Sequence, residues 1–192
     1  MSQKSNISSS RTAVLDAAEH LFASQGYGAV TLKDIAKKLG IKQASLYYHF
    51  PGGKEDLFVE VMLRHLERRR VTLEQIIATE SKSLEGCLAE LAAWLWEQPP
   101  LNANRIIHTD LTEINAQKAI EIEQAIGRCV HAPVEKLFAQ YQPQLRGDPG
   151  FIAGIFLCGV EPLPTVQKYG NKTKDEMIAE LISLVLYGAL IQ

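Results

Sequence analysis

The segment from Thr31 to Lys54 constrains the fold of this chain more than any other feature. Its sequence is TLKDIAKKLGIKQASLYYHFPGGK. Four of its residues recur at helical spacing and form one apolar face: Leu32, Ile35, Ala36 and Leu39. Gly40 follows them, and glycine readily adopts the left-handed conformation that ends a helix. The segment therefore predicts a short helix, a tight turn and a second helix.

Thr31 is the expected cap of the first helix. Its hydroxyl can accept a hydrogen bond from the N–H of Asp34, and the Asp34 carboxylate can reach back in a shortened capping box. Gly40 is small enough to let the two helices approach closely, with Ile41 and Leu46 filling the seam between them. These features predict a helix-turn-helix.

The second helix carries an outward face whose chemistry suits nucleic acid. Its members are donors, small residues and aromatic hydroxyls without an acid: Lys42, Gln43, Ala44, Ser45, Tyr47, Tyr48 and His49. Glutamine can bond adenine bidentately, lysine can reach guanine or phosphate, and hydroxyls can anchor phosphates. An ordinary helical bundle also yields helix–Gly–helix patterns with a polar second helix, so periodicity alone leaves both interpretations open.

The charge distribution places the basic residues with the predicted helix-turn-helix. Residues 1–54 hold seven Lys or Arg and three Asp or Glu, a net charge of +4, whereas residues 55–192 have a net charge of −6. The whole chain is therefore only slightly acidic, at −2. A basic end is the electrostatic footprint of a domain that binds phosphates, which favours an N-terminal surface for nucleic acid.

Residues 11–57 resemble the N-terminal domain of the TetR (tetracycline repressor) family. The similarity lies in a first helix with ALDAAEHLF-like spacing, Gly-Tyr before the capping Thr, and LYYHF followed by Gly-Lys-Glu-Asp-Leu. The matching residues are Ala17, Ala18, Leu21, Phe22, Gly26, Thr31, Ile35, Ala36, Gly40, Leu46, Tyr47, Phe50, Lys54 and Leu57. The rest of the chain resembles the family in length, helical pattern and order of segments.

The resemblance implies a set of DNA contacts at the matching positions. It implies phosphate contacts from Thr31, Tyr47, His49 and Lys54. It also implies positions at the base edges for Gln43, Ala44, Ser45 and Tyr48. Lys42 stands where the family often has a capping Ser or Thr, so this residue can either weaken the start of the helix or reach the DNA itself.

The expected fold is all-α and has three parts: a flexible arm at 1–10, a helix-turn-helix domain at 11–54, and a ligand-binding and dimerisation domain at 55–192. A hydrophobic content of 46% suffices for a helical core. Beyond the first domain the periodicity predicts helices at about 54–79, 83–98, 104–110, 111–141 with a bend at Pro133, 149–160 and 174–188. Residues 161–171 are expected to form a loop, or a helix that resumes briefly near Val166.

The last helix is apolar nearly all round from Met177 to Ile191. A membrane span needs about 20 apolar residues, and this run is shorter and contains Glu180. The helix is therefore either fully buried or packed on a partner, and the resemblance implies that the last two helices form the four-helix bundle of a homodimer. The residues expected in that interface are Ala153, Gly154, Leu157, Ile178, Leu181, Ile182 and Val185.

An apolar pocket is expected between the helices of the C-terminal domain, where bundles place their ligands. Its expected lining is Met62, Leu66, Leu88, Leu91, Trp94, Leu95, His108, Ile114 and Cys129. The same residues also fit a solid core. No cofactor and no metal is expected, and the widely spaced Cys87, Cys129 and Cys158 are expected to be reduced and buried.

The sequence therefore predicts a cytoplasmic homodimeric regulator, not an enzyme and not a membrane protein. Residues 1–10 are polar and do not resemble a secretory signal. The expected partners are a palindromic double-stranded operator and a small apolar or aromatic inducer that releases a repressor from it. Two alternatives stay open: a helical-bundle enzyme using His108, Asp110 and Glu113, and a constitutive DNA-binding architectural protein.

Overall fold

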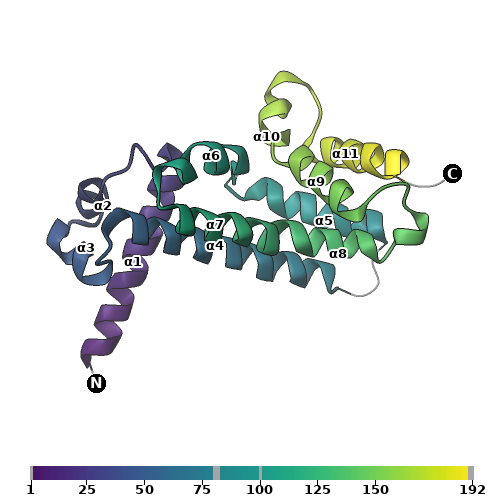
Figure 1. The fold of residues 1–192 in the computed structure, drawn as a ribbon. Coiled ribbons are helices and arrows are strands. Elements are labelled where there is room, and N and C mark those ends of the chain that lie inside the picture. The colour runs from purple at the N-terminus through teal and green to yellow at the C-terminus, as the bar shows by residue number, and fades with distance from the viewer. Residues whose placement is uncertain (1, 80–82, 100, 190–192) are drawn as a thin grey trace. The chain divides into compact units, whose positions relative to one another are not determined.

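The computed structural model describes residues 2–79, 83–99 and 101–189, and these residues form helices and connecting loops without a strand (Figure 1). The longer helices are α1 (Ser2–Gln25), α2 (Leu32–Leu39), α3 (Gln43–His49), α4 (Gly53–Ile77), α5 (Leu84–Glu97), α6 (Ala103–His108), α7 (Ala116–Ile126), α8 (Ala132–Ala139), α9 (Pro149–Val160) and α11 (Lys174–Ala189). Shorter turns are η1 (Asp110–Glu113), η2 (Gly127–His131), η3 (Gln142–Gln144), α10 (Leu163–Val166) and η4 (Gln167–Tyr169). The expected all-α class is confirmed.

Two compact units alternate along the chain. The first comprises residues 1–66 and 102–125, and the second comprises residues 67–101 and 126–192. In this division α6, η1 and most of α7 belong to the same unit as the helix-turn-helix, and the domain boundary at residues 54 and 55 stays a prediction. The polar contacts that join these distant segments carry no periodic signature in the sequence.

The core of the first unit is built around three aromatic rings from α1, its following loop and α4. The ring centroids of Phe22 and Phe58 are 5.1 Å apart, and those of Tyr27 and Phe58 are 4.8 Å apart. Polar contacts flank this core and join α1 to α4: the ion pairs of Arg11 with Glu60 and of Asp16 with Arg64, and the hydrogen bond between His65 and Glu19. The structure begins α1 at Ser2, so the helix includes most of the segment expected to be a flexible arm.

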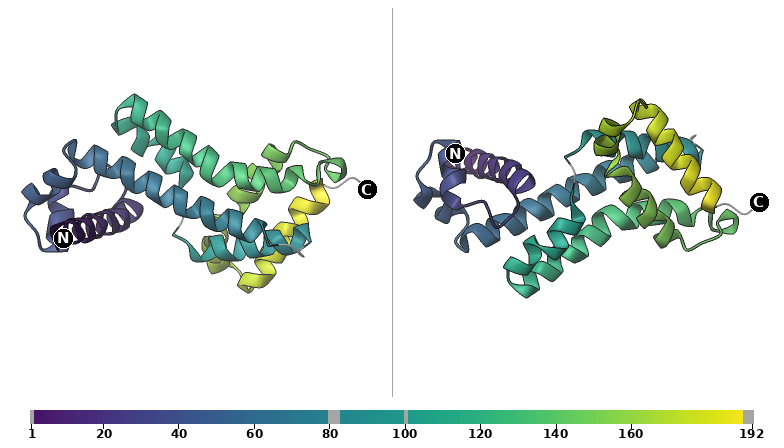
Figure 2. Two further views of the ribbon diagram at one scale, coloured as in Figure 1. Left: turned by 90° about the horizontal axis from the view of Figure 1, so that it is seen from below. Right: turned by 90° about the horizontal axis from the view of Figure 1, so that it is seen from above.

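The second unit packs α9 against α8 and α11, and α11 also contacts α5 (Figure 2). The apolar face predicted for α5 is buried, including Leu88 and Leu91. The rings of Phe138 on α8 and Phe156 on α9 lie 6.4 Å apart in an edge-to-face arrangement. Gly159 permits the close approach of α9 and α11, because a Cβ there would lie 2.6 Å from Cδ1 of Leu181.

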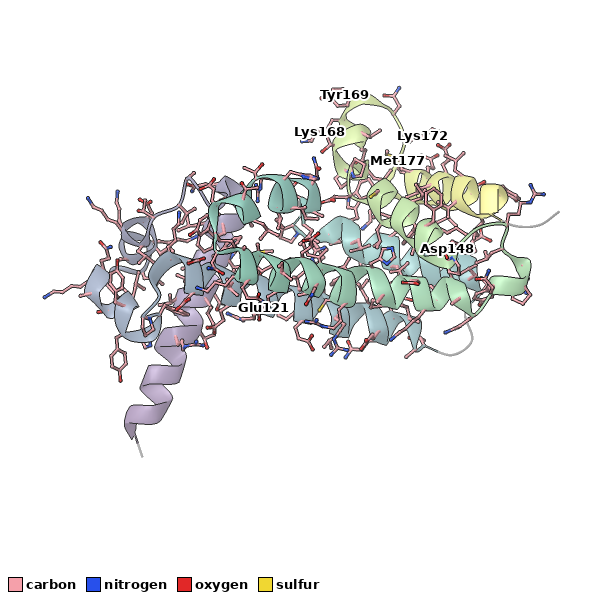
Figure 3. All side chains as sticks on the ribbon, viewed as in Figure 1. Glu121, Asp148, Lys168, Tyr169, Lys172 and Met177 are labelled. Atoms are coloured by element: carbon pink, nitrogen blue, oxygen red, sulfur yellow. The ribbon has the colours of Figure 1, made fainter. Side chains whose placement is uncertain are left out.

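The helix ends follow the capping residues that the sequence indicates. The Asp148 carboxylate, labelled in Figure 3, accepts from the N–H of Phe151 at 2.9 Å and starts α9. Thr173 and Glu176 form the expected capping box ahead of α11. Between these helices the chain forms only the short helical turns α10 and η4. This agrees with the second expectation for residues 161–171, a helix that resumes briefly near Val166.

The long helix expected at 111–141 begins later than predicted. Residues 110–113 form the separate turn η1, and the continuous helical run starts at Ala116. The run does not simply bend at Pro133. Instead the π-helical turn η2 precedes the proline, which has no N–H to donate and would otherwise crowd the carbonyl one turn earlier.

One stretch of the described residues, Pro149–Tyr169, is long and apolar enough to cross a membrane by length and composition. Only 28% of it is buried. Its inner face nevertheless packs within the second unit, where Ile152, Ala153, Phe156 and Val160 are buried. Pro162 and Pro164 interrupt the stretch, and its outer face carries the exposed apolar side chains described below.

Candidate nucleic-acid interface

Thr31 and Asp34 fix the start of α2 through the predicted capping box. The Thr31 hydroxyl accepts from the N–H of Asp34 at 3.2 Å, and the Asp34 carboxylate accepts from the N–H of Thr31 at 3.0 Å. Hydrogen bonds from the Thr31 hydroxyl and then from its backbone lower the pKa of Asp34. Gly40 ends α2 in the left-handed region, with φ at 67°, as predicted.

The recognition helix α3 presents its polar residues to solvent and one apolar residue to the core. Leu46 is fully buried, and Ile35 and Ala36 of α2 are buried as well. The exposed side chains are those of Lys42, Gln43, Ala44, Ser45, Tyr47 and Tyr48, with His49 half-buried. Lys42 occupies the N-cap position of α3 without a side-chain hydrogen bond to the helix, because an ammonium has no acceptor for the backbone N–H groups there.

The exposed face of α3 has the shape and the chemistry of a groove reader. Tyr48 is 72% exposed and Tyr47 is 49% exposed. No Asp or Glu lies on α3, and Lys33, Lys37 and Lys38 are exposed on the neighbouring α2. Hydroxyls, an amide and cations on one exposed helix match the donors that contact phosphates and base edges.

Lys54 differs from the other expected DNA contacts because its ammonium already has partners within the first unit. Its Nζ donates to the carbonyl oxygen of Tyr27 at 2.9 Å and lies 3.8 Å from the centroid of the Tyr27 ring. The side chain is half-buried. The lysine is thus held against the loop between α1 and α2.

A second set of polar residues, whose contacts with this loop the sequence did not indicate, binds the same loop from α6 and η1. The N–H of Tyr27 donates to Oδ1 of Asp110 at 2.9 Å, and Asp110 is only 3% exposed. Arg105 donates to the carbonyl oxygens of Phe22 and Ala23 at the end of α1. The sequence signal was an acid and a base five residues apart, which is too common to mark a site.

The three residues of the enzyme alternative do not share a site. Asp110 is engaged by Tyr27 and Arg105, whereas His108 and Glu113 are exposed. Across the described parts of the chain, no group of three His, Cys, Asp or Glu side chains is arranged to hold a metal ion.

The residues expected to line a ligand pocket differ in their burial. Met62, Leu66, Leu88, Leu91 and Cys129 are buried, whereas Trp94, Leu95 and Ile114 are half-buried. His108, the expected polar contact, is exposed. A groove of about 410 Å³ lies in the first unit, and none of the expected residues lines it: its walls are Arg11, His49, Phe50, Pro51, Asp56, Val59, Glu60, Leu63, Lys118 and Glu121.

The residues expected in the dimer interface lie partly inside the second unit. Ala153, Ile178, Ile182 and Val185 are buried within a single chain, while Gly154, Leu157 and Leu181 are half-buried. The outward apolar side chains of α9 and α11 are others that the sequence did not single out: Phe151, Ile155, Leu184 and Tyr187. We call these four residues the α9–α11 face.

The expectation for one of the three cysteines needs correction. Cys87 and Cys129 are buried free thiols as expected, but the free thiol of Cys158 is exposed because it lies on the outer side of α9. Burial raises the pKa of the Cys129 thiol. Arg70 pairs with Glu67 and Glu74 on the surface, whereas Arg69 is buried and donates to the carbonyl of Pro99.

The fold and the exposed α3 define a helix-turn-helix DNA-binding protein. Residues 14–61 match the model of the tetR family of bacterial regulatory proteins. This match confirms the resemblance of the N-terminal residues to the DNA-binding domain of the TetR family.

The relatives that match this chain are transcriptional regulators. It is 36% identical over 86 residues to LmrA, an HTH-type transcriptional regulator of Bacillus subtilis, which covers 43% of this chain and 46% of LmrA. It is 32% identical over 121 residues to KstR2, an HTH-type transcriptional repressor of Rhodococcus jostii, covering 56% and 58% of the two chains. The chain thus spans about half the length of these curated relatives. The named relatives are regulators of transcription, the class of protein that the sequence predicts.

The all-helical fold also has solved counterparts. The choline complex of a transcriptional regulator from Saccharomonospora viridis aligns with 96% of this chain and 100% of its own, with a TM-score of 0.72 and 22% identity. At that identity the likeness shows the fold alone.

Proposed function

We propose that this protein is a homodimeric transcriptional repressor that binds a palindromic operator and is released by a small molecule. The observation that carries the proposal is the exposed, acid-free face of α3 on a capped helix-turn-helix. A single helix of this kind reaches only a short half-site, so symmetric dimers are its usual working form. Repression is favoured over activation because the relative KstR2 is a transcriptional repressor. The protein would act in the cytoplasm, where its DNA is.

The DNA contacts divide by chemistry. Thr31, Tyr47 and His49 are assigned to phosphates, because hydroxyls and imidazole donors position a protein on the backbone without reading sequence. The base edges are assigned to Gln43, Ala44, Ser45 and Tyr48, whose side chains are exposed together on α3. Lys42 is assigned to guanine or to a neighbouring phosphate, since its ammonium is not used in capping.

The α9–α11 face is the proposed centre of the dimer interface. Phe151 is 68% exposed, and Leu184 and Tyr187 are each 76% exposed. Large apolar side chains clustered on two neighbouring helices of a soluble chain mark an interaction surface. A two-fold axis through this face would bring α9 and α11 of both subunits into one four-helix bundle.

The proposed inducer is a small apolar or aromatic molecule bound by the helices of the C-terminal part. The fold counterpart from Saccharomonospora viridis binds choline, so this fold can accommodate a small molecule. Such a ligand must bind the DNA-free state better than the DNA-bound state, and by linkage DNA must weaken ligand binding by the same factor. A 100-fold preference corresponds to about 2.7 kcal/mol per site.

Selection of random DNA fragments by the pure protein tests the first half of the proposal. We expect the recovered sequences to share an inverted repeat and footprinting to show protection of both half-sites. Recovery without any common sequence would contradict sequence-specific binding. A thermal-shift screen of apolar and aromatic metabolites then tests the second half, because each stabilising ligand should release a labelled operator. Ligands that stabilise the protein but leave operator affinity unchanged would favour a constitutive DNA-binding protein.

A further inference from the structure

Side chains from two other segments form hydrogen bonds with both backbone polar groups of Tyr27, in the loop between α1 and α2. Its N–H donates to the Asp110 carboxylate of η1, and its carbonyl accepts from the Lys54 ammonium of α4, each at 2.9 Å. We call Asp110, Tyr27 and Lys54 the Tyr27 clamp. It joins three segments that are far apart in the sequence but belong to one compact unit.

We infer that Asp110 and Lys54 are positioning residues that set the orientation of the DNA-reading helices, and that Lys54 acts in this way and not as a phosphate contact. The inference rests on the proposed DNA-binding function. It departs from the phosphate role that the family resemblance implied for Lys54. The proposal concerns how α2 and α3 are held before DNA arrives.

The Asp110 side of the clamp is built for rigidity. A buried carboxylate is costly unless its oxygens are paired. Asp110 is 3% exposed, and its oxygens meet the N–H of Tyr27 and, at 3.4 Å, Nε of Arg105. Loss of either contact would therefore be costly in free energy, because water could not replace the missing partner of the buried Tyr27 amide or Asp110 carboxylate.

Arg105 contacts the end of α1, next to the Tyr27 clamp. Its guanidinium donates to the carbonyl oxygens of Phe22 and Ala23 at 3.3 Å. Carbonyls at a helix C-terminus have no intrahelical donors and carry the negative end of the helix dipole, so a cation is stabilising there. The Glu113 carboxylate of η1 also lies beside this loop, because a Cβ on Gly28 would lie 2.8 Å from its Oε1.

The Lys54 side of the clamp is anchored at the start of α4. Glu55 accepts from the N–H of Asn115 at 2.5 Å, and Asp56 accepts from Lys118 at 2.6 Å. The hydrogen bond from the Lys118 ammonium is the largest cause of the lowered pKa of Asp56. The first turn of α4 is thus tied both to the Tyr27 loop and to α7, so its direction is determined before DNA binds.

The recognition helix is coupled to this anchored turn by a short connection. Phe50, at the end of α3, is 2% exposed, and the N–H of Gly53 donates to its carbonyl at 2.9 Å. Lys54 is the next residue. At the other side, Tyr27 leads within four residues into Thr31, the cap of α2. Holding both ends fixes the helix-turn-helix, and such preorganisation favours binding by lowering its entropic cost.

The first experiment compares Lys54→Met with Lys136→Met, measuring operator affinity as a function of salt concentration. Methionine keeps the apolar stem over the Tyr27 ring but cannot donate, and Lys136 supplies an exposed lysine of α8 in the second unit as the control for lost charge. We expect Lys54→Met to weaken operator binding about tenfold while its salt slope equals that of the control. A slope lower than that of the control by about one unit per subunit would overturn the positioning role, because it reports a lost phosphate contact.

The second experiment compares Asp110→Ala with Asp110→Asn in the full-length protein. Asparagine retains an oxygen that can accept from the Tyr27 N–H, whereas alanine does not. We expect the Tyr27 amide to exchange its hydrogen about tenfold faster in Asp110→Ala, with operator affinity reduced alongside, and asparagine to restore most of both. Equal amide exchange in wild type and Asp110→Ala, or equal operator affinity in folded protein, would overturn the clamp.

The two proposals fail in different ways. If wild-type protein selects no operator, the proposed function fails, and amide exchange at Tyr27 still decides whether the clamp exists in the free protein. If the wild-type protein selects an operator and both Asp110 variants bind it with wild-type affinity, the proposed function stands and the positioning role is wrong.

Discussion

Single hydrogen bonds at Thr31 illustrate how much one side chain decides. Its hydroxyl caps α2 and is the main cause of the lowered pKa of Asp34. We expect Thr31→Ala to raise the pKa of Asp34 toward its ordinary value of 3.8 and to destabilise the protein by about 1 kcal/mol, the usual cost of losing a Thr cap. NMR titration and urea unfolding measure the two effects. Thr31→Ser should leave both unchanged, and an Asp34 titration identical in all three proteins would contradict the capping role.

Gln43 is the residue from which we expect sequence discrimination. Its side chain is exposed at the start of α3, where an amide can bond adenine bidentately. Gln43→Ala should change which operator is preferred, by about 1–3 kcal/mol for each affected base pair, and leave the salt slope as in wild type. Competition binding with single-base operator variants measures the change. An unaltered preference would remove Gln43 from the base contacts.

The ion pair of Asp56 with Lys118 should make stability depend on acid pH. The pKa of Asp56 is lowered in the folded protein from an ordinary value of 3.8, so the charged form is favoured by folding. This contribution is present above pH 3.8 and is lost as the pH falls through the lower, folded pKa. We expect the difference in unfolding free energy between wild type and Asp56→Asn to shrink as the pH falls from 7 to the acid range. Lys118→Met should remove the same pH dependence, and a difference that is constant with pH would argue against the pair.

At the scale of helices and turns, two glycines allow a test with opposite signs. A Cβ at Gly40 or at Gly127 would meet nothing within 4 Å, so sterics with neighbours do not contribute. Gly40 has a left-handed φ, whereas Gly127 lies within a helical run. We expect Gly40→Ala to destabilise the protein by about 1–2 kcal/mol and Gly127→Ala to stabilise it by about 0.5–1 kcal/mol. Chemical denaturation measures both, and a stabilised Gly40→Ala variant would contradict the turn geometry.

The starts of helices could be predicted from the sequence, but the local form of one long helix could not. Helix starts are predicted by residues whose side chains accept from backbone amides three positions later: Thr31, Asp148 and Thr173. This interaction is contained within four residues. Pro133 announced a disturbance of the helical ladder as well. The sequence pattern did not show whether that disturbance becomes a bend or the π-helical turn that the structure has.

For the whole molecule, the α9–α11 face predicts which charges will separate subunits. Leu184 is 76% exposed, whereas its neighbour Val185 is 8% exposed. We expect Leu184→Glu to give a folded monomer that has lost operator binding, because the unpaired charge would be desolvated only in the dimer. Val185→Glu should instead unfold the second unit, because its charge is buried within one chain. Light scattering and circular dichroism distinguish these outcomes, and a wild-type monomer at micromolar concentration would contradict the dimer.

The sequence by itself determined the helical class, the capped helix-turn-helix and the exposed polar face of α3. These features depend on periodicity, capping and turn chemistry, which act between residues a few positions apart. Only the tertiary structure decided that Lys54 faces Tyr27, that Asp110 is buried, and that Leu184 and not Val185 lies on the surface. The rotation of an apolar helix and the partners of a charged side chain are set by segments distant in the chain. Because those contacts are non-local, composition and spacing carry no record of them.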